Sequence, residues 1–246
     1  MAMPKLDIAG VPVLAITGET LIREVNQRME QGDKTFLFFA NSNLLMKADD
    51  MARRLADPDV LLVNDGIAMD LAARLTHHRA FPENLNGTDF VPALLEDNAK
   101  ASEQWKVFLF GGKPGIAALA GAELARRGVQ VVGSADGYGS HGGPLVEQIN
   151  ASGADVVLIA LGNPLQERWA FEHSGEINAR LLVGVGALLD FLAGDKPRAP
   201  SWIRSMRLEW AYRLSLEPTR LMRRYTIDMA KFLIKCARSR SSTVSR

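Results

Sequence analysis

The sequence predicts an α/β fold: a Rossmann-like, mainly parallel sheet with helices on both faces and a basic helical appendage at the C-terminus. Short apolar runs alternate with amphipathic segments along most of the chain, a pattern typical of β-α-β units. The runs are continuously apolar, as expected of strands that are covered on both faces. The last 51 residues hold 13 Lys/Arg and 3 Asp/Glu, which sets this segment apart from the rest.

Six runs predict strands because they are rich in β-branched, aromatic and leucine side chains and are bounded by turn-forming or polar residues. They cover residues 35–40, 60–63, 106–110, 129–132, 155–161 and 180–185. Amphipathic segments between them predict helices over residues 19–31, 43–56, 88–100, 114–127 and 164–173. In a sheet of this kind, ligands bind beyond the carboxyl ends of the strands.

The α/β pattern ends near Pro197 and Pro200, since prolines at this spacing interrupt regular structure. We therefore divide the chain into an α/β domain, residues 1–195, and an appendage, residues 196–246. Residues 1–195 hold 16 Lys/Arg and 25 Asp/Glu, so an acidic body carries a basic tail. Such asymmetry indicates a polyanionic partner, which is a membrane surface, a phosphate-rich ligand or a nucleic acid.

Bulk composition limits the class of protein. Of the 246 residues, 47% are hydrophobic and 23% are charged, which allows a sizeable core. The single cysteine, Cys236, excludes an intrachain disulfide and is typical of a reducing compartment. The N-terminus does not resemble a signal peptide, and no run approaches the ~20 apolar residues of a membrane span. We therefore expect a cytoplasmic protein whose membrane contact is peripheral.

The appendage is amphipathic from Pro218 onward. Apolar side chains at spacings of three or four form one face: Leu221, Tyr225, Met229, Phe232 and Cys236. Basic side chains lie on the adjacent flank: Arg220, Arg224, Lys231, Lys235 and Arg238. A basic amphipathic helix suits the interface of an anionic membrane. The alternative is a helix that packs on the body, or on another subunit of a homo-oligomer, with its arginines paired to the acidic domain.

Polar side chains directly follow two of the predicted strands. Asn41 and Asn43 can hydrogen-bond a sugar, although Asn43 could instead cap the next helix. Asn64, Asp65 and Gly66 come directly after the predicted strand at residues 60–63, and an aspartate such as Asp65 at this strand end is well placed for a general base. The sequence Asn-Asp-Gly around it is also typical of a plain turn.

Glycines and a polar helix start follow the other strands. Gly111 and Gly112 lie where a backbone could approach phosphate near a helix N-terminus, and a tight β-α turn is the alternative. Gln166 and Glu167 lie in the first turn of a helix beside the same cleft. Glu167 could be no more than a favourable charge near that helix N-terminus. Small residues at 184–187 are consistent with a ligand that passes close to the backbone.

Ten motifs occur in order along residues 41–225: Asn41-x-Asn43, Asn64-Asp65-Gly66, Gly87-Thr88-Asp89, Phe110-Gly111-Gly112-x-Pro114-Gly115, Gly137-Tyr138, Gly162-x-Pro164-x-Gln166-Glu167, Gly184-x-Gly186-Ala187, Arg198-Ala199-Pro200-x-Trp202, Leu208-Glu209-Trp210-x-Tyr212-Arg213-Leu214 and Glu217-Pro218-x-Arg220-Leu221-x-Arg223-Arg224-Tyr225. Together they resemble the WecG/TagA/CpsF family of bacterial glycosyltransferases. The resemblance covers nearly the whole chain, and its C-terminal motifs are the most specific.

The resemblance implies an inverting, metal-independent transfer from a UDP-sugar donor to a lipid-linked acceptor. The acceptor is typically a saccharide on undecaprenyl diphosphate at the inner membrane face. Products of the family feed teichoic acid, enterobacterial common antigen or exopolysaccharide. Its members handle N-acetylmannosamine, its uronic acid, glucose and glucuronic acid, and we identify no residue in this sequence that selects among these sugars.

By the same resemblance, Asp65 takes the place of the family's catalytic aspartate, with Asn64 where proline is usual. An inverting transfer needs a base for the proton of the acceptor hydroxyl, so we predict that Asp65 is this base. The predicted substrate-binding residues from the body are Asn41, Asn43, Gly111, Gly112, Gln166, Glu167, Gly184 and Gly186. The family often has threonine at the position of Asn41.

Without a metal ion, the UDP that leaves needs positive charge from the protein, and guanidinium groups match phosphate well. The arginines predicted for this role are Arg213, Arg220, Arg223 and Arg224.

Two sequence patterns resemble metal sites, but each has a simpler explanation. Asp57-Pro58-Asp59 matches the Asp-x-Asp motif of many metal-dependent glycosyltransferases, but it precedes a strand, on the side away from a cleft. The pair at residues 77–78, His-His, is typical of a surface helix end. We expect no metal ion and no other cofactor.

Other function classes fit less well. A nucleotide-dependent oxidoreductase predicts a Gly-x-Gly-x-x-Gly motif after the first strand, where this chain has Asn41-Ser42-Asn43. A nucleic-acid-binding protein could use the basic tail, but no recognised nucleic-acid motif is present, so we expect no nucleic-acid partner. A non-catalytic protein that binds a sugar nucleotide remains the alternative to an enzyme.

Overall fold

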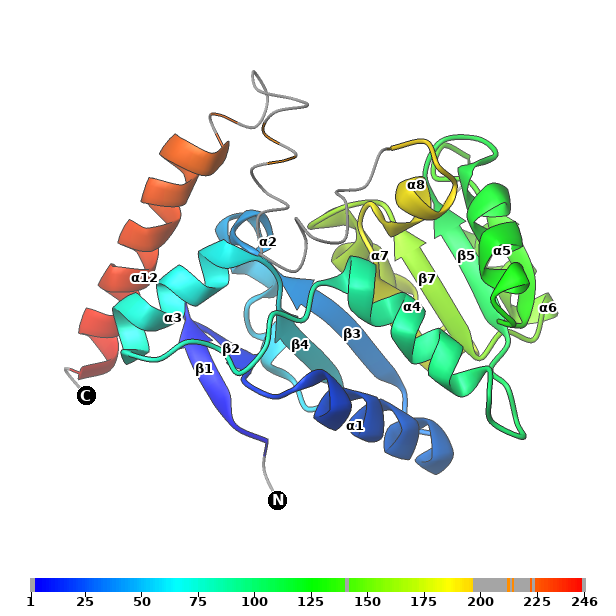
Figure 1. Cartoon of the computed structure of the whole chain (residues 1–246), viewed down its shortest axis with the longest axis horizontal. Helices are drawn as coiled ribbons and strands as arrows, with labels where there is room; N and C mark the ends of the chain where they lie inside the picture. The colour runs from blue at the N-terminus through cyan, green and yellow to red at the C-terminus, as the bar shows by residue number, and fades with distance from the viewer. Residues whose placement is uncertain are drawn as a thin grey trace.

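The computed structural model of the protein describes residues 3–139, 142–196 and 224–244, with Tyr212, Leu214 and Met222. Its centre is an eight-stranded sheet in the order β1-β2-β4-β3-β8-β7-β5-β6 (Figure 1). The strands are β1 (Lys5–Ile8), β2 (Val11–Leu14), β3 (Thr35–Ala40), β4 (Val60–Asn64), β5 (Val107–Gly111), β6 (Val131–Ala135), β7 (Val156–Ala160) and β8 (Leu181–Gly184). In the described chain, β1 and β2 pair antiparallel and all other neighbours pair parallel.

Helices lie on both faces of the sheet. They are α1 (Gly18–Gln31), α2 (Ser42–Lys47), α3 (Ile67–His77), α4 (Gly87–Asn98), α5 (Ile116–Arg126), α6 (Gly143–Ala151), α7 (Leu165–His173), α8 (Leu188–Leu192) and α12 (Met229–Val244). The 3₁₀ turns η1 (Asp49–Met51) and η2 (Arg54–Ala56) follow α2, and the π-helical turn η3 (Arg224–Asp228) precedes α12.

Alternate side chains of the central strands supply two cores. Phe36 and Phe38 of β3 are buried in one core, and Leu37 and Phe39 are buried in the other. Helices α2, α3, α6, α7 and α12 cover the first face, and α1, α4, α5 and α8 cover the second. Because both faces are covered, the strands need no polar alternation. The predicted fold class is confirmed.

All six predicted strands are present, with ends that differ by at most three residues. Sequence analysis missed the β1–β2 hairpin. Its turn places Ala9 at φ 56° and Gly10 at φ 85°, and the Asp7 carboxylate accepts a hydrogen bond of 3.0 Å from the Gly10 N–H. Alanine is uncommon at positive φ, and Pro12 in β2 is unusual for a strand, so the usual hairpin signals were absent.

The predicted helix at residues 43–56 is wrong in part. The segment forms the short helix α2 and then the two 3₁₀ turns η1 and η2. Arg54 in η2 bonds the carboxylates of Asp57 and Asp59. The other four predicted helices are present.

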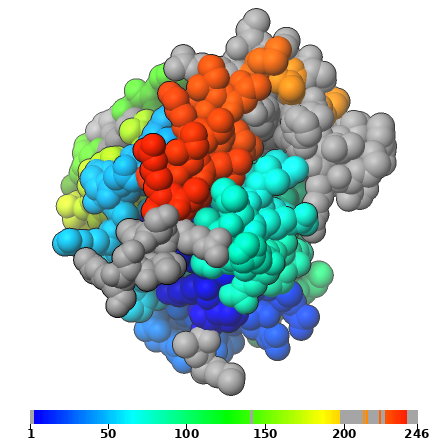
Figure 2. Space-filling model, turned by 90° about the vertical axis from the view of Figure 1, so that its left-hand side faces the viewer, coloured from blue at the N-terminus to red at the C-terminus, as the bar shows by residue number. Residues whose placement is uncertain are grey.

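Helix α12 packs on the body beside α3 (Figures 1 and 2). Two residues of the predicted apolar face, Phe232 and Cys236, are turned inward and are 0% and 1% exposed. Leu221 and the side chain of Tyr225, which were predicted for the same face, lie outside the described residues. The Lys235 ammonium donates to the Leu45 carbonyl at 2.8 Å and pairs with Asp49. For this helix, packing on the body is therefore the alternative that the structure shows. None of the helices in the described part of the chain is long and apolar enough to cross a membrane.

Candidate active site

A cavity of about 580 Å³ opens at the carboxyl ends of the parallel strands, where ligands of such sheets bind. Its walls come from the loops after β3, β4, β7 and β8, from the first turns of α2, α3, α4 and α7, and from single residues of α8 and α12. Predicted site residues that line it are Asn41, Asn43, Asp65, Gln166, Gly184 and Gly186. The structure thus brings together residues that are up to 145 positions apart in the sequence.

Asp65 directly follows β4, and its half-buried side chain lines the cavity. Its backbone N–H donates to the Ala40 carbonyl at the end of β3, at 2.7 Å. Gly66, at φ 88°, donates its N–H to Asn84 at 2.8 Å. The buried side chain of Asn64 donates to the Glu83 carbonyl at 3.0 Å. The neighbours therefore build the turn, and they place the Asp65 carboxylate at the cavity.

Asn41 is the N-cap of α2, where its Oδ1 accepts a hydrogen bond of 3.1 Å from the Leu44 N–H. The alternative that Asn43 caps this helix is therefore wrong, because Asn43 lies in the first turn. Both asparagines reach the loop after β7. Asn41 Nδ2 donates to Asn163 Oδ1 and Asn43 Nδ2 donates to the Asn163 carbonyl, each at 3.2 Å. These bonds join the ends of β3 and β7.

Gln166 and Glu167 extend this network to β8. Asn163 Nδ2 and Gln166 Nε2 both donate to Glu167 Oε1, at 2.5 and 2.9 Å. Gln166 Oε1 accepts from the Gly186 N–H at 3.0 Å. A Cβ atom on Gly184 would lie 2.7 Å from Gln166 Nε2, so the amide packs directly against the backbone of β8. Gln166 therefore reaches the cavity wall with both its amide nitrogen and its amide oxygen held by hydrogen bonds.

Glu167 is 0% exposed and does not line the cavity. Burial raises the pKa of its carboxyl to about 7, although hydrogen bonds from Gln166, its own backbone N–H and Asn163 act in the opposite direction. Glu167 is therefore not simply a solvent-exposed charge that stabilises the N-terminus of α7. Nor does its carboxylate reach the cavity surface, where a direct substrate contact would be made.

The raised pKa of Glu167 can be tested through the pH dependence of protein stability. Folded Glu167 titrates near pH 7 and an unfolded glutamate near pH 4.5, so the unfolded chain loses its proton first as pH rises. Wild-type stability should therefore fall between pH 5 and 8, relative to Glu167→Gln, by about 2 to 3 kcal/mol. Urea denaturation of both proteins at the two pH values measures this. A difference that does not change with pH would contradict it.

The structure places Gly111 and Gly112 away from the cavity lining. Gly111 has φ 126°, and a Cβ atom there would lie 2.5 Å from the Ala160 carbonyl oxygen. The Gly112 carbonyl accepts a bond of 2.9 Å from the Gly137 N–H. Both glycines therefore allow strand ends to approach closely, as in the alternative of a tight β-α turn. Their predicted contact with a nucleotide stays a prediction.

Sequence analysis missed the start of α4 as part of the cavity wall. Asn86 caps α4 by accepting from the Asp89 N–H at 2.9 Å, and the Asp89 carboxylate accepts from Asn86 Nδ2 at 3.0 Å. Gly87 packs against the ring of Phe39. With Thr88, these residues line the cavity. The signal was a capping sequence, Asn-Gly-Thr-Asp, directly before a predicted helix.

Other lining residues that were missed are Asp70, Asn84, Asp190, Lys196 and Met229. No simple sequence signal marks them, because they lie in the first turns of α3 and α12, within α8 or in loops, without a capping or glycine pattern. Lys196 forms an ion pair with Asp190. Among the cavity-lining residues that the structure describes, Lys196 is the only one with a basic side chain. Arg213, Arg220 and Arg223, and the side chain of Arg224, lie outside what the structure describes.

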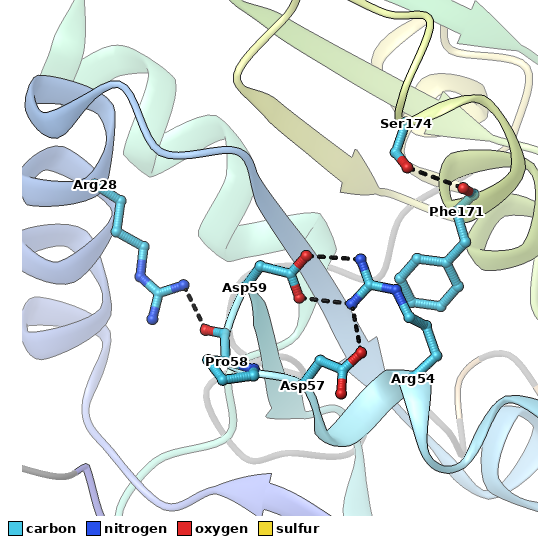
Figure 3. A network of polar contacts seen from close by, with 7 residues as sticks. All are labelled: Arg28, Arg54, Asp57, Pro58, Asp59, Phe171 and Ser174. Carbon is cyan, nitrogen blue, oxygen red and sulfur yellow. Dashed lines mark hydrogen bonds and ion pairs between the residues drawn. The ribbon is translucent and has the colours of Figure 1, made fainter.

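Asp57 and Asp59 lie at the opposite ends of the strands, where both bind Arg54 (Figure 3). Two oxygens of Asp59 accept from the guanidinium at 2.6 Å each, and Asp57 accepts at 3.1 Å. The guanidinium also packs on the rings of Phe36 and Phe171, 4.8 and 4.5 Å from their centres. The two carboxylates therefore already pair with a cation of the protein. The His-His pair is at the end of α3, as predicted.

Comparison with known protein families gives one match. The model of the "Glycosyl transferase WecG/TagA/CpsF family" matches residues 6–246. The match includes every element that lines the cavity, and it extends through the basic C-terminal segment.

Proposed function

Because this chain belongs to the WecG/TagA/CpsF family of glycosyltransferases, we propose that it transfers a sugar from a UDP-sugar to a saccharide on undecaprenyl diphosphate. The transfer inverts the anomeric centre, needs no metal ion and serves the synthesis of cell-surface polysaccharide. The observation that carries this proposal is the position of Asp65, a carboxylate at the wall of a cavity rich in amide side chains.

In this mechanism, an acceptor hydroxyl attacks the anomeric carbon of the donor as the bond to UDP breaks. Asp65 takes the proton of that hydroxyl, since a carboxylate at a strand end can act as a general base. Asn43 and Gln166, which line the same cavity, hold hydroxyl groups of the sugar or the acceptor. Inversion follows because the attack takes place on the face opposite to the leaving group.

UDP gains negative charge as it leaves, so its oxygens need cations or hydrogen-bond donors. Lys196 offers one cation in the cavity wall. We assign the remaining charge to Arg213, Arg220, Arg223 and Arg224, which the same family match covers. On this proposal, residues 1–195 form a catalytic domain with the base, and residues 196–246 complete the site and contact the membrane.

A surface formed by α3 and α12, which lie side by side (Figure 2), suits an anionic membrane at the inner face of the cytoplasmic membrane. Ile67, Leu71 and Leu75 of α3 are 40%, 41% and 45% exposed. On α12, Lys231, Ile234 and Arg238 are exposed and share one face, whereas Phe232 and Cys236 are buried. Apolar side chains flanked by basic ones match an anionic lipid interface, where each basic residue contributes about 1 kcal/mol. Ile67 and Met229 also line the cavity, so this surface borders its mouth.

The chemistry is tested by incubating the protein with a panel of UDP-sugars and an undecaprenyl-diphosphate saccharide, with product detection by mass spectrometry. We expect one donor to be consumed, with equal rates in buffer and in excess EDTA. No transfer from any UDP-sugar would overturn the proposed donor class. Activity that EDTA abolishes and Mn²⁺ restores would overturn the metal-independent mechanism.

Membrane contact through this surface predicts that Leu75→Glu lowers binding to phosphatidylglycerol vesicles by about tenfold, because it removes apolar contact and adds a repelled charge. Flotation of the protein with such vesicles measures the effect. The matched control is Leu119→Glu, since Leu119 is 58% exposed on α5, across the sheet, and it should leave flotation unchanged. Equal flotation of the two variants would contradict the assignment of the surface.

A further inference from the structure

Amide side chains that follow two strands, β3 and β7, form a network around one carboxylate. Glu167 Oε1 accepts from Asn163 Nδ2 at 2.5 Å and from Gln166 Nε2 at 2.9 Å. Asn163 in turn accepts from Asn41 and Asn43, each at 3.2 Å. Four of these five side chains belong to cavity-lining residues, and the fifth, Glu167, lies fully buried behind them.

The network leaves the amides with donors to offer. An ionised carboxylate only accepts hydrogen bonds, so Asn163 and Gln166 must turn their NH₂ groups toward Glu167. Their carbonyl oxygens then face protein donors: Gln166 Oε1 accepts from the Gly186 N–H at 3.0 Å, and Asn163 Oδ1 accepts from Asn41. Each NH₂ group has two N–H donors, and the network uses one of them. The second N–H of each amide is therefore the donor that can bond a ligand.

We propose that Glu167 is a positioning residue, which orients the amides of Asn163 and Gln166 so that the cavity presents N–H donors to oxygen atoms of the sugar nucleotide. The identity of that ligand rests on the proposed function, whereas the orientation of the amides does not. Without the carboxylate, either amide could turn over and present its carbonyl oxygen. A carbonyl would repel the oxygen-rich ligand that the N–H groups attract.

The placement of Glu167 is costly for the fold. Burial raises its pKa to about 7, and its second oxygen, Oε2, has no hydrogen-bond partner within the described residues. A carboxylate kept where burial opposes its charge is typical of functional sites. The close packing of the Gln166 amide on Gly184 also leaves the amide few alternative positions, so its orientation is decided by what it bonds.

A measurement without any ligand tests the orientation itself. Glu167→Met keeps the length of the side chain and removes the acceptor, whereas Glu167→Gln keeps one oxygen that can accept from both amides. If Gln166 turns over in Glu167→Met, the Gly186 N–H loses its acceptor. We expect its hydrogen exchange, measured by NMR at pH 8, to be about tenfold faster, as for the loss of one hydrogen bond. In Glu167→Gln it should change by less than about threefold. Unchanged exchange in Glu167→Met would overturn the proposal.

Kinetics test the consequence for the ligand. Glu167→Met should raise the KM for the UDP-sugar by about 10- to 100-fold, the effect of one or two misdirected hydrogen bonds, with a smaller change in kcat. Glu167→Gln should restore most of the affinity. Equal KM values for the two variants would overturn the role of the acceptor oxygen. If the wild-type protein transfers no sugar, the proposed function fails, and the exchange of the Gly186 N–H still decides the role of Glu167.

Trp169→Phe controls for mere disturbance of α7. Trp169 is a buried neighbour on the same helix, and its ring lies 4.8 Å from that of Phe110 and 5.0 Å from that of His173. It should change stability and leave the KM within about threefold. A KM increase equal to that of Glu167→Met would overturn the proposal. If Glu167→Met does not fold, Glu167→Asp serves in its place, because the shorter side chain cannot reach both amides, and unchanged KM and exchange there would overturn the proposal.

Discussion

Asp65→Asn should lower kcat for sugar transfer by about 10²- to 10⁴-fold, the range that a positioned general base contributes. Asparagine has the shape of aspartate but cannot take a proton. The turn itself is held by backbone and neighbouring groups, with the residue 65 N–H on the Ala40 carbonyl and the Gly66 N–H on Asn84. The KM for the donor should therefore change little. Release of UDP, followed by a coupled assay, measures both constants.

Asp57→Asn is the matched control, because Asp57 lies at the opposite ends of the strands and binds Arg54. It should keep wild-type turnover. Unchanged kcat in Asp65→Asn would remove Asp65 as the base. If the wild-type protein binds a UDP-sugar but releases no UDP, the result favours the alternative that its sequence left open, a non-catalytic sugar-nucleotide-binding protein.

Phe232→Ala should lower the free energy of unfolding by about 3 to 5 kcal/mol, as for other buried phenylalanines. Phe232 is 0% exposed, in the core that also contains α3 residues. It attaches α12 to the body, and Met229 of that helix lines the cavity. We therefore expect weaker attachment of α12 to the body, with faster hydrogen exchange in this helix and a higher KM for the donor.

Ile234→Ala provides the control on the same helix. Ile234 is 52% exposed on the opposite face, so its truncation should change the free energy of unfolding by no more than about 0.5 kcal/mol. Urea denaturation of both variants measures the contrast. Equal values would mean that α12 does not pack on the body through Phe232.

The sequence predicted the fold where local patterns determine it. Continuous apolar runs such as residues 35–40 are buried on both faces in the structure, and their alternation with amphipathic segments indicated a mainly parallel sheet. The hairpin at residues 5–14 was missed because alanine occupies a position of positive φ. The amphipathic pattern of the tail was correct for Phe232 and Cys236. Pattern alone could not decide whether this face meets lipid or protein, since both environments are apolar.

The candidate site was predictable only in part. Residues at strand ends, such as Asp65 and Asn41, could be placed because parallel strands end at the same edge. The burial of Glu167 could not be predicted, because it depends on Asn163 and on a second strand end that lies far away in the sequence. For the same reason Asp190 and Lys196, which pair across the end of α8, did not stand out among other charged residues.

The central claim is a single displacement in which Asp65 acts as base, and the anomeric configuration of the product tests it most directly. The wild-type protein is given the UDP-sugar that it consumes, and NMR coupling constants at the anomeric carbon are compared between donor and product. We predict the opposite configuration in the product, because one attack on the face away from UDP inverts the centre. A product with the configuration of the donor would contradict this mechanism.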